Sequence, residues 1–185
     1  MIAPEVWNQP VPKWKMQQFQ RLKSIHLLTS RFNKTTQKEC EKFREQIRKR
    51  CVYCSPLQIT SKIPKGAVVL VLEMNNETNQ IIGIGMLRNI PQPRTFLVYE
   101  TENYNRICYV GNHRIDRSEF TSEELTSIIT LLEQLCFAGK SHLKRGQGIT
   151  AFPLRKLCQS YDSCDIIETI MDMFRARKEE QEKTK

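Results

Sequence analysis

The chain has 185 residues, 39% of them hydrophobic, and a formal net charge of +9 at neutral pH. This length suits one domain of ordinary size, which can bury a core without a metal ion or a disulfide. No apolar run approaches the roughly 18 residues that cross a bilayer, and the first residues lack the regions of a secretory signal, so we expect no membrane partner. Seven scattered cysteines, an odd number, favour reduced thiols and an intracellular location, in cytoplasm or nucleus.

The positive charge is concentrated in two zones. Residues 13–50 hold twelve Lys and Arg against three Glu, and residues 134–161 hold five against no acidic residue. Between them, residues 66–133 carry five basic and nine acidic side chains. Two basic zones favour contact with a polyanion, although a generally solvated basic surface explains the same composition.

In chain order, residues 1–13 contain three prolines and no periodicity, which predicts an extended arm. Residues 16–28 fit either a helix or a strand. Thr36 and Glu39 then form a capping-box pattern, which predicts a helix over about residues 37–50. Its apolar face consists of Cys40, Phe43 and Ile47. Its basic face consists of Lys42, Arg44, Arg48 and Lys49.

Strands follow the helix. Residues 67–74 and 80–88 are apolar runs joined by a segment rich in turn formers, so we predict an antiparallel hairpin. Gly83 and Gly85 share one face of its second strand, where a large group must lie against the backbone. Three shorter runs are also typical of strands: 51–54, 95–99 and 106–110.

The C-terminal third is predicted to be mainly helical. Thr121 and Glu124 form a second capping-box pattern, for a helix that ends at Gly139. Residues 153–158 fit a short turn or helix, and Asp162 or Ser163 caps a last helix. Its inward positions are Ile166, Ile167, Ile170, Met171 and Phe174. We therefore divide the chain into the arm, a single α+β domain over residues 14–175 and a charged, fraying tail over residues 176–185.

The segment 139–148 carries the strongest binding pattern. It combines three basic residues, a histidine and three glycines directly after a helix. Glycines let main-chain N–H groups face an anion, and Lys and Arg contact phosphate. The spacing differs from the phosphate loop of nucleotide hydrolases. A glycine-capped surface turn explains the same residues equally well.

Two further polar segments, 103–106 and 111–117, flank the strand expected at 106–110. They offer Tyr, Asn, His and Arg, which stack on bases and contact phosphate in RNA-binding surfaces. Two turns stabilised by Asn and Asp side chains are the alternative. The residues that we predict to contact nucleic acid are Arg44, Arg48, Tyr104, Asn105, Arg106, Asn112, His113, Arg114, Lys140, His142, Lys144, Arg145 and Gln147.

No catalytic, metal or cofactor site is predicted. Cys51 and Cys54 have the spacing of a zinc half-site, but a structural zinc needs four ligands and no second pair accompanies them. Three histidines are present without a hydrolase motif. The carboxylates Glu100, Glu102 and Asp116 match no nuclease spacing that we can defend.

The segment Ile63–Leu70 followed by Ile81–Met86 resembles PUA-like barrels, in particular EVE and YTH domains, over about residues 22–115. The resemblance implies a small, curved, mainly antiparallel β-barrel flanked by three or four helices, often holding RNA or a modified base. The tryptophans, Trp7 in the arm and Trp14 directly after it, do not lie where a methyl-base cage of YTH type would need them. Residues 71–79 and 142–148 also resemble uncharacterised proteins of nucleocytoplasmic large DNA viruses.

These patterns favour a nucleic-acid-binding module, for RNA in preference to DNA, over an enzyme. The first alternative is a structural or assembly component of a virion or complex, with viral or host protein partners. The second is a nucleic-acid-processing enzyme that uses His113 or His142 with a nearby carboxylate.

Overall fold

The computed structural model describes residues 25–153, 155–156 and 165–183. Contacts divide the chain into two units, Ile25–Ala151 and a second one formed by the two ends of the chain. The predicted N-terminal arm, both tryptophans and the predicted cap at Asp162 or Ser163 lie outside the described residues.

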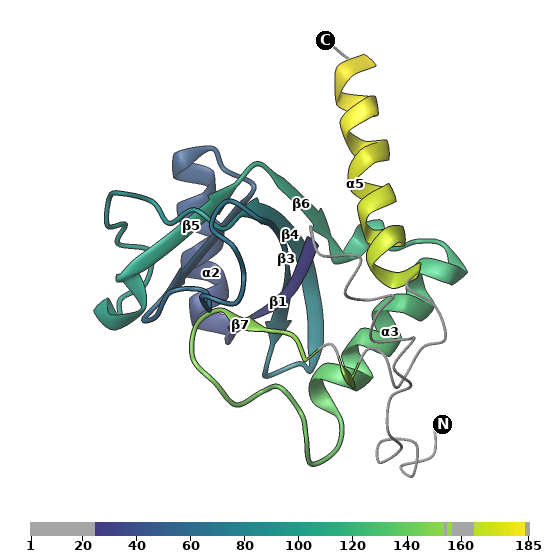
Figure 1. Ribbon diagram of the computed structural model, residues 1–185, viewed down its shortest axis with the longest axis horizontal. Coiled ribbons are helices and arrows are strands. Elements are labelled where there is room, and N and C mark those ends of the chain that lie inside the picture. Colours follow the sequence, from purple (N-terminus) through teal and green to yellow (C-terminus); the bar gives the residue numbers. More distant parts are fainter. Residues whose placement is uncertain (1–24, 154, 157–164, 184–185) are drawn as a thin grey trace. The chain divides into compact units, whose positions relative to one another are not determined.

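The Ile25–Ala151 unit is built on two sheets (Figure 1). The larger has the order β6-β4-β3-β1-β7, with bounds His113–Asp116, Gln80–Arg88, Val68–Asn75, Ile25–Phe32 and Thr150–Ala151. β1 runs parallel to β3, and the other neighbours are antiparallel. The smaller sheet pairs β2 (Cys51–Ser55) with β5 (Ile107–Gly111), also antiparallel. The ambiguous segment 16–28 is thus a strand from Ile25 onward.

Helices complete the described structure. The α-helices whose bounds are described are α2 (Lys34–Ile47), α3 (Glu123–Phe137) and α5 (Asp165–Lys183), and residues 155–156 are helical as well. Two short 3-10 helices are η2 (Glu102–Asn105) and η3 (Arg117–Glu119). In Figure 1, α2 and α3 lie on opposite sides of the larger sheet. The α+β class is confirmed, but the larger sheet is mixed, and the strands that the structure describes do not close into a barrel.

The predicted hairpin is confirmed as β3 and β4, with a turn in which Asn79 has φ +55°. The two glycines of β4 explain how it packs. A Cβ at Gly85 would overlap the Tyr53 hydroxyl, and one at Gly83 would overlap the Arg114 guanidinium. The predicted large group is therefore an aromatic ring at Gly85 and a guanidinium at Gly83. Because Tyr53 belongs to β2, this contact joins the two sheets.

The core of the unit lies between these sheets and α2. Cys40 of α2 is buried, and Phe43 and Ile47 pack partly buried against the same cluster, as the helical spacing predicts. In the second unit α5 continues to Lys183, through most of the charged tail. Ile166, Ile167, Ile170 and Phe174 are buried, and Met171 is half-buried.

Both helix starts differ from the predicted ones. The N-cap of α2 is Asn33, whose side chain accepts from Thr36 N at 2.8 Å, while Thr36 Oγ1 accepts from Asn33 N at 3.0 Å. The predicted capping box at Thr36 is therefore wrong by one turn, because Thr36 fills the last position of the box and not the first. The N-cap of α3 is Ser122 and not Thr121.

The strand predicted at 95–99 is absent, because a side chain takes the place of a neighbouring strand. Asn105 Oδ1 accepts from Val98 N and Tyr99 N, at 3.0 and 2.9 Å, and Asn105 Nδ2 donates to Tyr99 O at 2.6 Å. These bonds hold the segment as a loop.

Cys54 and Cys108 form a disulfide across β2 and β5, where they are directly opposite in the register. The expectation of reduced thiols is therefore wrong for this pair. Cys51 points elsewhere and donates its thiol to the His113 carbonyl at 3.5 Å. Within the described residues no group of three or more His, Cys, Asp or Glu is placed to hold a metal ion. The described helices include none that is both long and apolar enough to span a bilayer.

Candidate nucleic-acid interface

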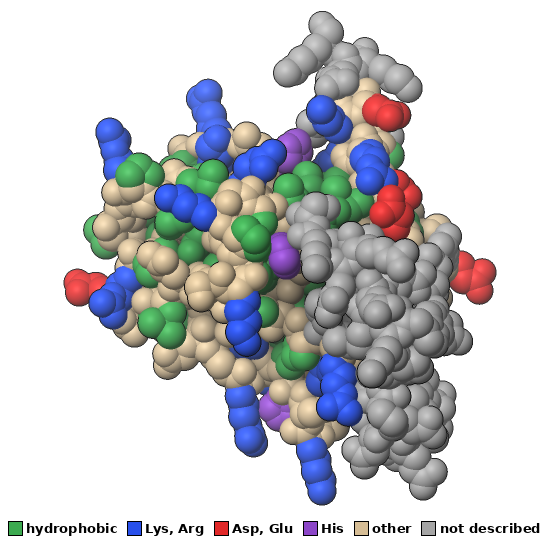
Figure 2. All heavy atoms as spheres, in the orientation of Figure 1, with side chains coloured by type: hydrophobic (Ala, Val, Ile, Leu, Met, Phe, Trp, Pro, Cys, Tyr) green, Lys and Arg blue, Asp and Glu red, His purple; other side chains and the backbone are tan. Residues whose placement is uncertain are grey.

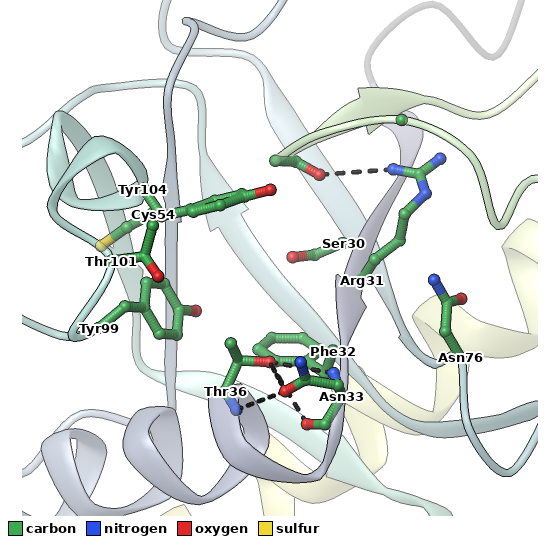
Figure 3. A pocket seen from close by; sticks show the side chains of 12 residues that line it. Ser30, Arg31, Phe32, Asn33, Thr36, Cys54, Asn76, Tyr99, Thr101 and Tyr104 are labelled. Atoms are coloured by element: carbon green, nitrogen blue, oxygen red, sulfur yellow. Dashed lines mark hydrogen bonds between the residues drawn. The ribbon is translucent and has the colours of Figure 1, made fainter.

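A pocket of about 290 Å³ opens at the end of β1 (Figure 3). Its walls come from the last residues of β1, the start of α2, Cys54 of β2, the segment 99–104 and the glycines of the loop 146–148. Segments far apart in the sequence therefore meet in one concave site. Its volume lies near the lower end of the roughly 300–1,000 Å³ that is usual for small-molecule sites.

One wall of the pocket is aromatic. Tyr99 and Tyr104 lie edge to face, with ring centroids 6.4 Å apart and an interplanar angle of 83°. Tyr104 is half-buried on η2, and Tyr99 is 8% exposed. Burial raises the pKa of the Tyr99 hydroxyl well above its usual value, so this group stays neutral. The bonds from Asn105 to the Tyr99 backbone keep this wall in place.

The facing wall is polar. In Figure 3 the Ser30 hydroxyl points into the space between the tyrosines and Arg31. Asn33 and Thr36 also line the pocket, but their side chains are occupied by the α2 cap. Asn76 donates its amide to Lys144 O at 3.2 Å, while its Oδ1 is buried without a partner among the described residues.

Arg31 lies at the edge of the pocket nearest to the basic loop. Its Nε donates to Leu143 O at 2.6 Å, Nη2 to Thr150 Oγ1 at 3.0 Å and Nη1 to Gly148 O at 3.4 Å. No carboxylate forms an ion pair with Arg31 in the part of the chain that the structure describes. The loop 139–148 is thus tied to β1 by one cationic side chain.

The predicted loop residues extend from this contact. Lys140, Arg145 and Gln147 are exposed. Lys144 Nζ donates to Asn79 Oδ1 at 2.8 Å, and His142 Nδ1 accepts from Lys144 N at 3.3 Å. The loop therefore presents Lys140 and Arg145 to solvent, whereas Lys144 is partly engaged with the β3–β4 turn.

Two predicted arginines lie inside the fold around Glu73, which is 1% exposed. Glu73 accepts from Arg114 Nη2 at 2.7 Å, from Tyr53 Oη at 2.7 Å and from Arg44 Nη1 at 3.4 Å. The side chains of Arg44 and Arg114 are each 13% exposed. Their charges are therefore compensated within the protein. The predicted contact residue Asn105 is also occupied, because its amide bonds the backbone of Val98 and Tyr99.

The other predicted residues lie elsewhere. Asn112 is exposed and accepts from Lys49 Nζ at 2.9 Å. Asn112 and His113 line a second, more open cavity of about 460 Å³ and not the pocket at β1. Arg48 is exposed at the C-cap of α2, and Arg106 is exposed after η2. Of the predicted set, the structure brings Tyr104 and the loop 139–148 together.

Several residues of the pocket were not predicted from the sequence, among them Ser30, Arg31, Asn76 and Tyr99. Arg31 is the one Lys or Arg of β1 and lies between Ser30 and Phe32, so it looks like an ordinary outward strand position. Only the pairing of β1 with β7 brings it to the loop. Asn76 lies in the segment between the two predicted hairpin strands, so its residue type predicted a turn and not a binding site.

Basic side chains stand out over the Ile25–Ala151 unit on the face that Figure 2 shows, and acidic ones are sparse there. Comparisons with protein-family models, with curated proteins and with solved structures found no match to the chain. The interpretation of the site therefore rests on its geometry and charge.

Proposed function

We propose that the protein binds nucleic acid, RNA in preference to DNA, by taking one unpaired base into the pocket at β1 and contacting phosphates through the loop 139–148. The observation that carries this proposal is the position of an aromatic pocket wall beside a loop with two exposed, unpaired cations among the described residues.

The aromatic wall supports the base contact. Proteins recognise single-stranded RNA by stacking splayed-out bases on aromatic rings and by bonding the base edges. Tyr104 offers a half-buried ring, and Ser30 offers a hydroxyl opposite. The pocket volume suits one base better than a larger ligand. Duplex DNA would first have to release a base, at a cost of a few kcal/mol.

The loop supports the phosphate contacts. Phosphate contacts dominate the affinity of nucleic-acid-binding proteins and need cations that are free to replace counterions. Lys140 and Arg145 meet this condition, whereas Arg44 and Arg114 are already compensated by Glu73. We therefore leave Arg44, Arg114 and Asn105 out of the proposed interface.

We also propose that the two sheets correspond to an opened form of the PUA-like barrel. The parallel β1–β3 pair, the β3–β4 hairpin and the Tyr53–Gly85 contact between the sheets support this relationship.

An assembly role is the second candidate. Leu57 and Leu97 are 71% and 78% exposed, and large exposed apolar side chains are common in protein contacts. If the protein binds no oligonucleotide but elutes as a complex through these loops, this role takes first place.

Binding of a fluorescent ten-residue single-stranded RNA, measured by anisotropy, tests the proposal. Tyr104→Ala should weaken binding by roughly 1–3 kcal/mol, the usual cost of one stacked base. Tyr104→Phe keeps the ring and should bind nearly as the parent does. Equal affinity of all three proteins would remove the pocket from the interface, and tighter binding of duplex DNA than of RNA would contradict the preferred ligand.

A further inference from the structure

The guanidinium of Arg31 differs from the other half-buried arginines of the Ile25–Ala151 unit in what it contacts. Arg44, Arg114 and Arg117 each contact a glutamate carboxylate. Arg31 instead donates to two carbonyl oxygens and one hydroxyl, all of them neutral. Its positive charge is therefore uncompensated by any carboxylate in the described residues.

An uncompensated, partly buried charge is unfavourable, and burial indeed lowers the pKa of Arg31 from its usual value. Arginine nevertheless stays protonated in proteins. A bound anion would supply the missing charge, and an arginine fork suits phosphate in particular.

The guanidinium has donors left for such an anion. It has five N–H groups, and the described contacts use one on each nitrogen. Arg31 lines the pocket, and in Figure 3 it lies across the open space from Tyr104, beside Asn76.

Gly146, which lines the pocket beside Arg31, carries no side chain that could cover the guanidinium. A Cβ at Gly146 would lie 3.3 Å from Arg31 Cζ, and the residue has φ +130°, which other residues rarely adopt. The loop thus passes close to Arg31 without placing a side chain over it.

We propose that Arg31 forms an anion subsite of the pocket, which holds a phosphate attached to the nucleotide whose base lies against Tyr104. The ligand of the pocket is then a phosphorylated nucleotide and not a bare base or nucleoside. The base contact rests on the proposed function, whereas the anion contact follows from Arg31 alone.

The test compares nucleosides with their 5′- and 3′-monophosphates, and with inorganic phosphate, by calorimetry on the full chain. The parent should bind one monophosphate about tenfold or more tightly than the matching nucleoside, as expected for a charge-assisted hydrogen bond. Arg31→Gln should abolish that advantage, so that this variant binds the monophosphate no more tightly than the nucleoside. Arg88→Gln is the matched control, because Arg88 also donates to a carbonyl, that of Gly66, but lies outside the pocket.

A purely structural role of Arg31 would give a different result. The Nε–H resonance of Arg31 in the parent should shift on addition of the monophosphate and not of the nucleoside, and this readout needs no variant. Arg31→Lys should retain part of the advantage, since it keeps the charge. Should Arg31→Gln fail to fold, the comparison of ligands on the parent and the Nε–H shift decide the question.

Two outcomes separate this inference from the proposed function. Oligonucleotide binding without any advantage of monophosphate over nucleoside overturns the anion subsite alone. Monophosphate or inorganic phosphate bound through Arg31, with no binding of any oligonucleotide, keeps the subsite and overturns the proposed function.

Discussion

At the scale of single residues, charge compensation decides which cations are available to a ligand. Arg44 and Arg114 surround the buried Glu73, together with the Tyr53 hydroxyl. Removing one partner of such a buried group leaves an uncompensated charge and is costly. These arginines therefore serve the fold. Arg31 has no such carboxylate among the described residues and is the one that faces the pocket.

The cysteines give a residue-scale prediction. Burial raises the pKa of both Cys40 and Cys51 to about 12, so at pH 8 their thiolate fraction is far below that of an exposed thiol. At pH 8 iodoacetamide should therefore label neither thiol in the native protein, and the slow labelling at higher pH should still rise with pH at pH 10. Cys54 and Cys108 should be labelled only after reduction.

Peptide mapping by mass spectrometry after native, denatured and reduced labelling checks this prediction. Denaturation alone should expose Cys40 and Cys51, and this step serves as the positive control. Native labelling of Cys54 at pH 8 without a reductant would show that the β2–β5 disulfide is not formed in solution.

At the scale of elements, the apolar runs and the turn-forming residues were sufficient to predict the hairpin, because β3 and β4 each carry a long apolar run and are separated by a short turn. They were not sufficient for the segment 95–99. Its strand-like composition is overridden by Asn105, ten residues away at most, whose amide satisfies the backbone groups that a neighbouring strand would otherwise bond. Such tertiary contacts leave no periodic pattern.

Asn105→Ala tests this explanation. The substitution leaves the buried N–H groups of Val98 and Tyr99 without their acceptor, at a cost of about 1–3 kcal/mol. The free energy of unfolding in urea measures it. Asn103→Ala, an exposed change in the same 3-10 helix, is the control and should cost less than about 0.5 kcal/mol. Similar values for both variants would contradict the role given to Asn105.

At the scale of the whole molecule, composition predicted a basic protein, and the predicted helices and strands an α+β fold, a class that the structure confirms. Part of the candidate site, Tyr104 and the loop 139–148, was predicted from the sequence, because aromatic and basic residue types are recognisable in a local segment. It missed Arg31, Ser30 and Asn76, since their meeting depends on the pairing of β1 with β3 and β7. The open sheets were likewise not visible in a pattern that predicted a barrel.

The salt dependence of RNA binding tests the central claim most directly. For a single strand, each phosphate neutralised contributes about −0.7 to the slope of log K against log salt. Lys140→Gln combined with Arg145→Gln should weaken binding to all sequences similarly and flatten this slope by roughly 1 to 1.5. The control pair is Lys62→Gln with Lys65→Gln, which removes two exposed charges just before β3. The loop 139–148 lies at the other end of β3, where Lys144 O accepts from Asn76.

The slope should be flatter for the loop pair and equal to the parent's for the control pair. If both pairs change the slope equally, the contact is with the general positive charge of the protein. If the loop pair binds single-stranded RNA with the parent's affinity and slope, the loop 139–148 is only a turn, and the proposed interface is contradicted.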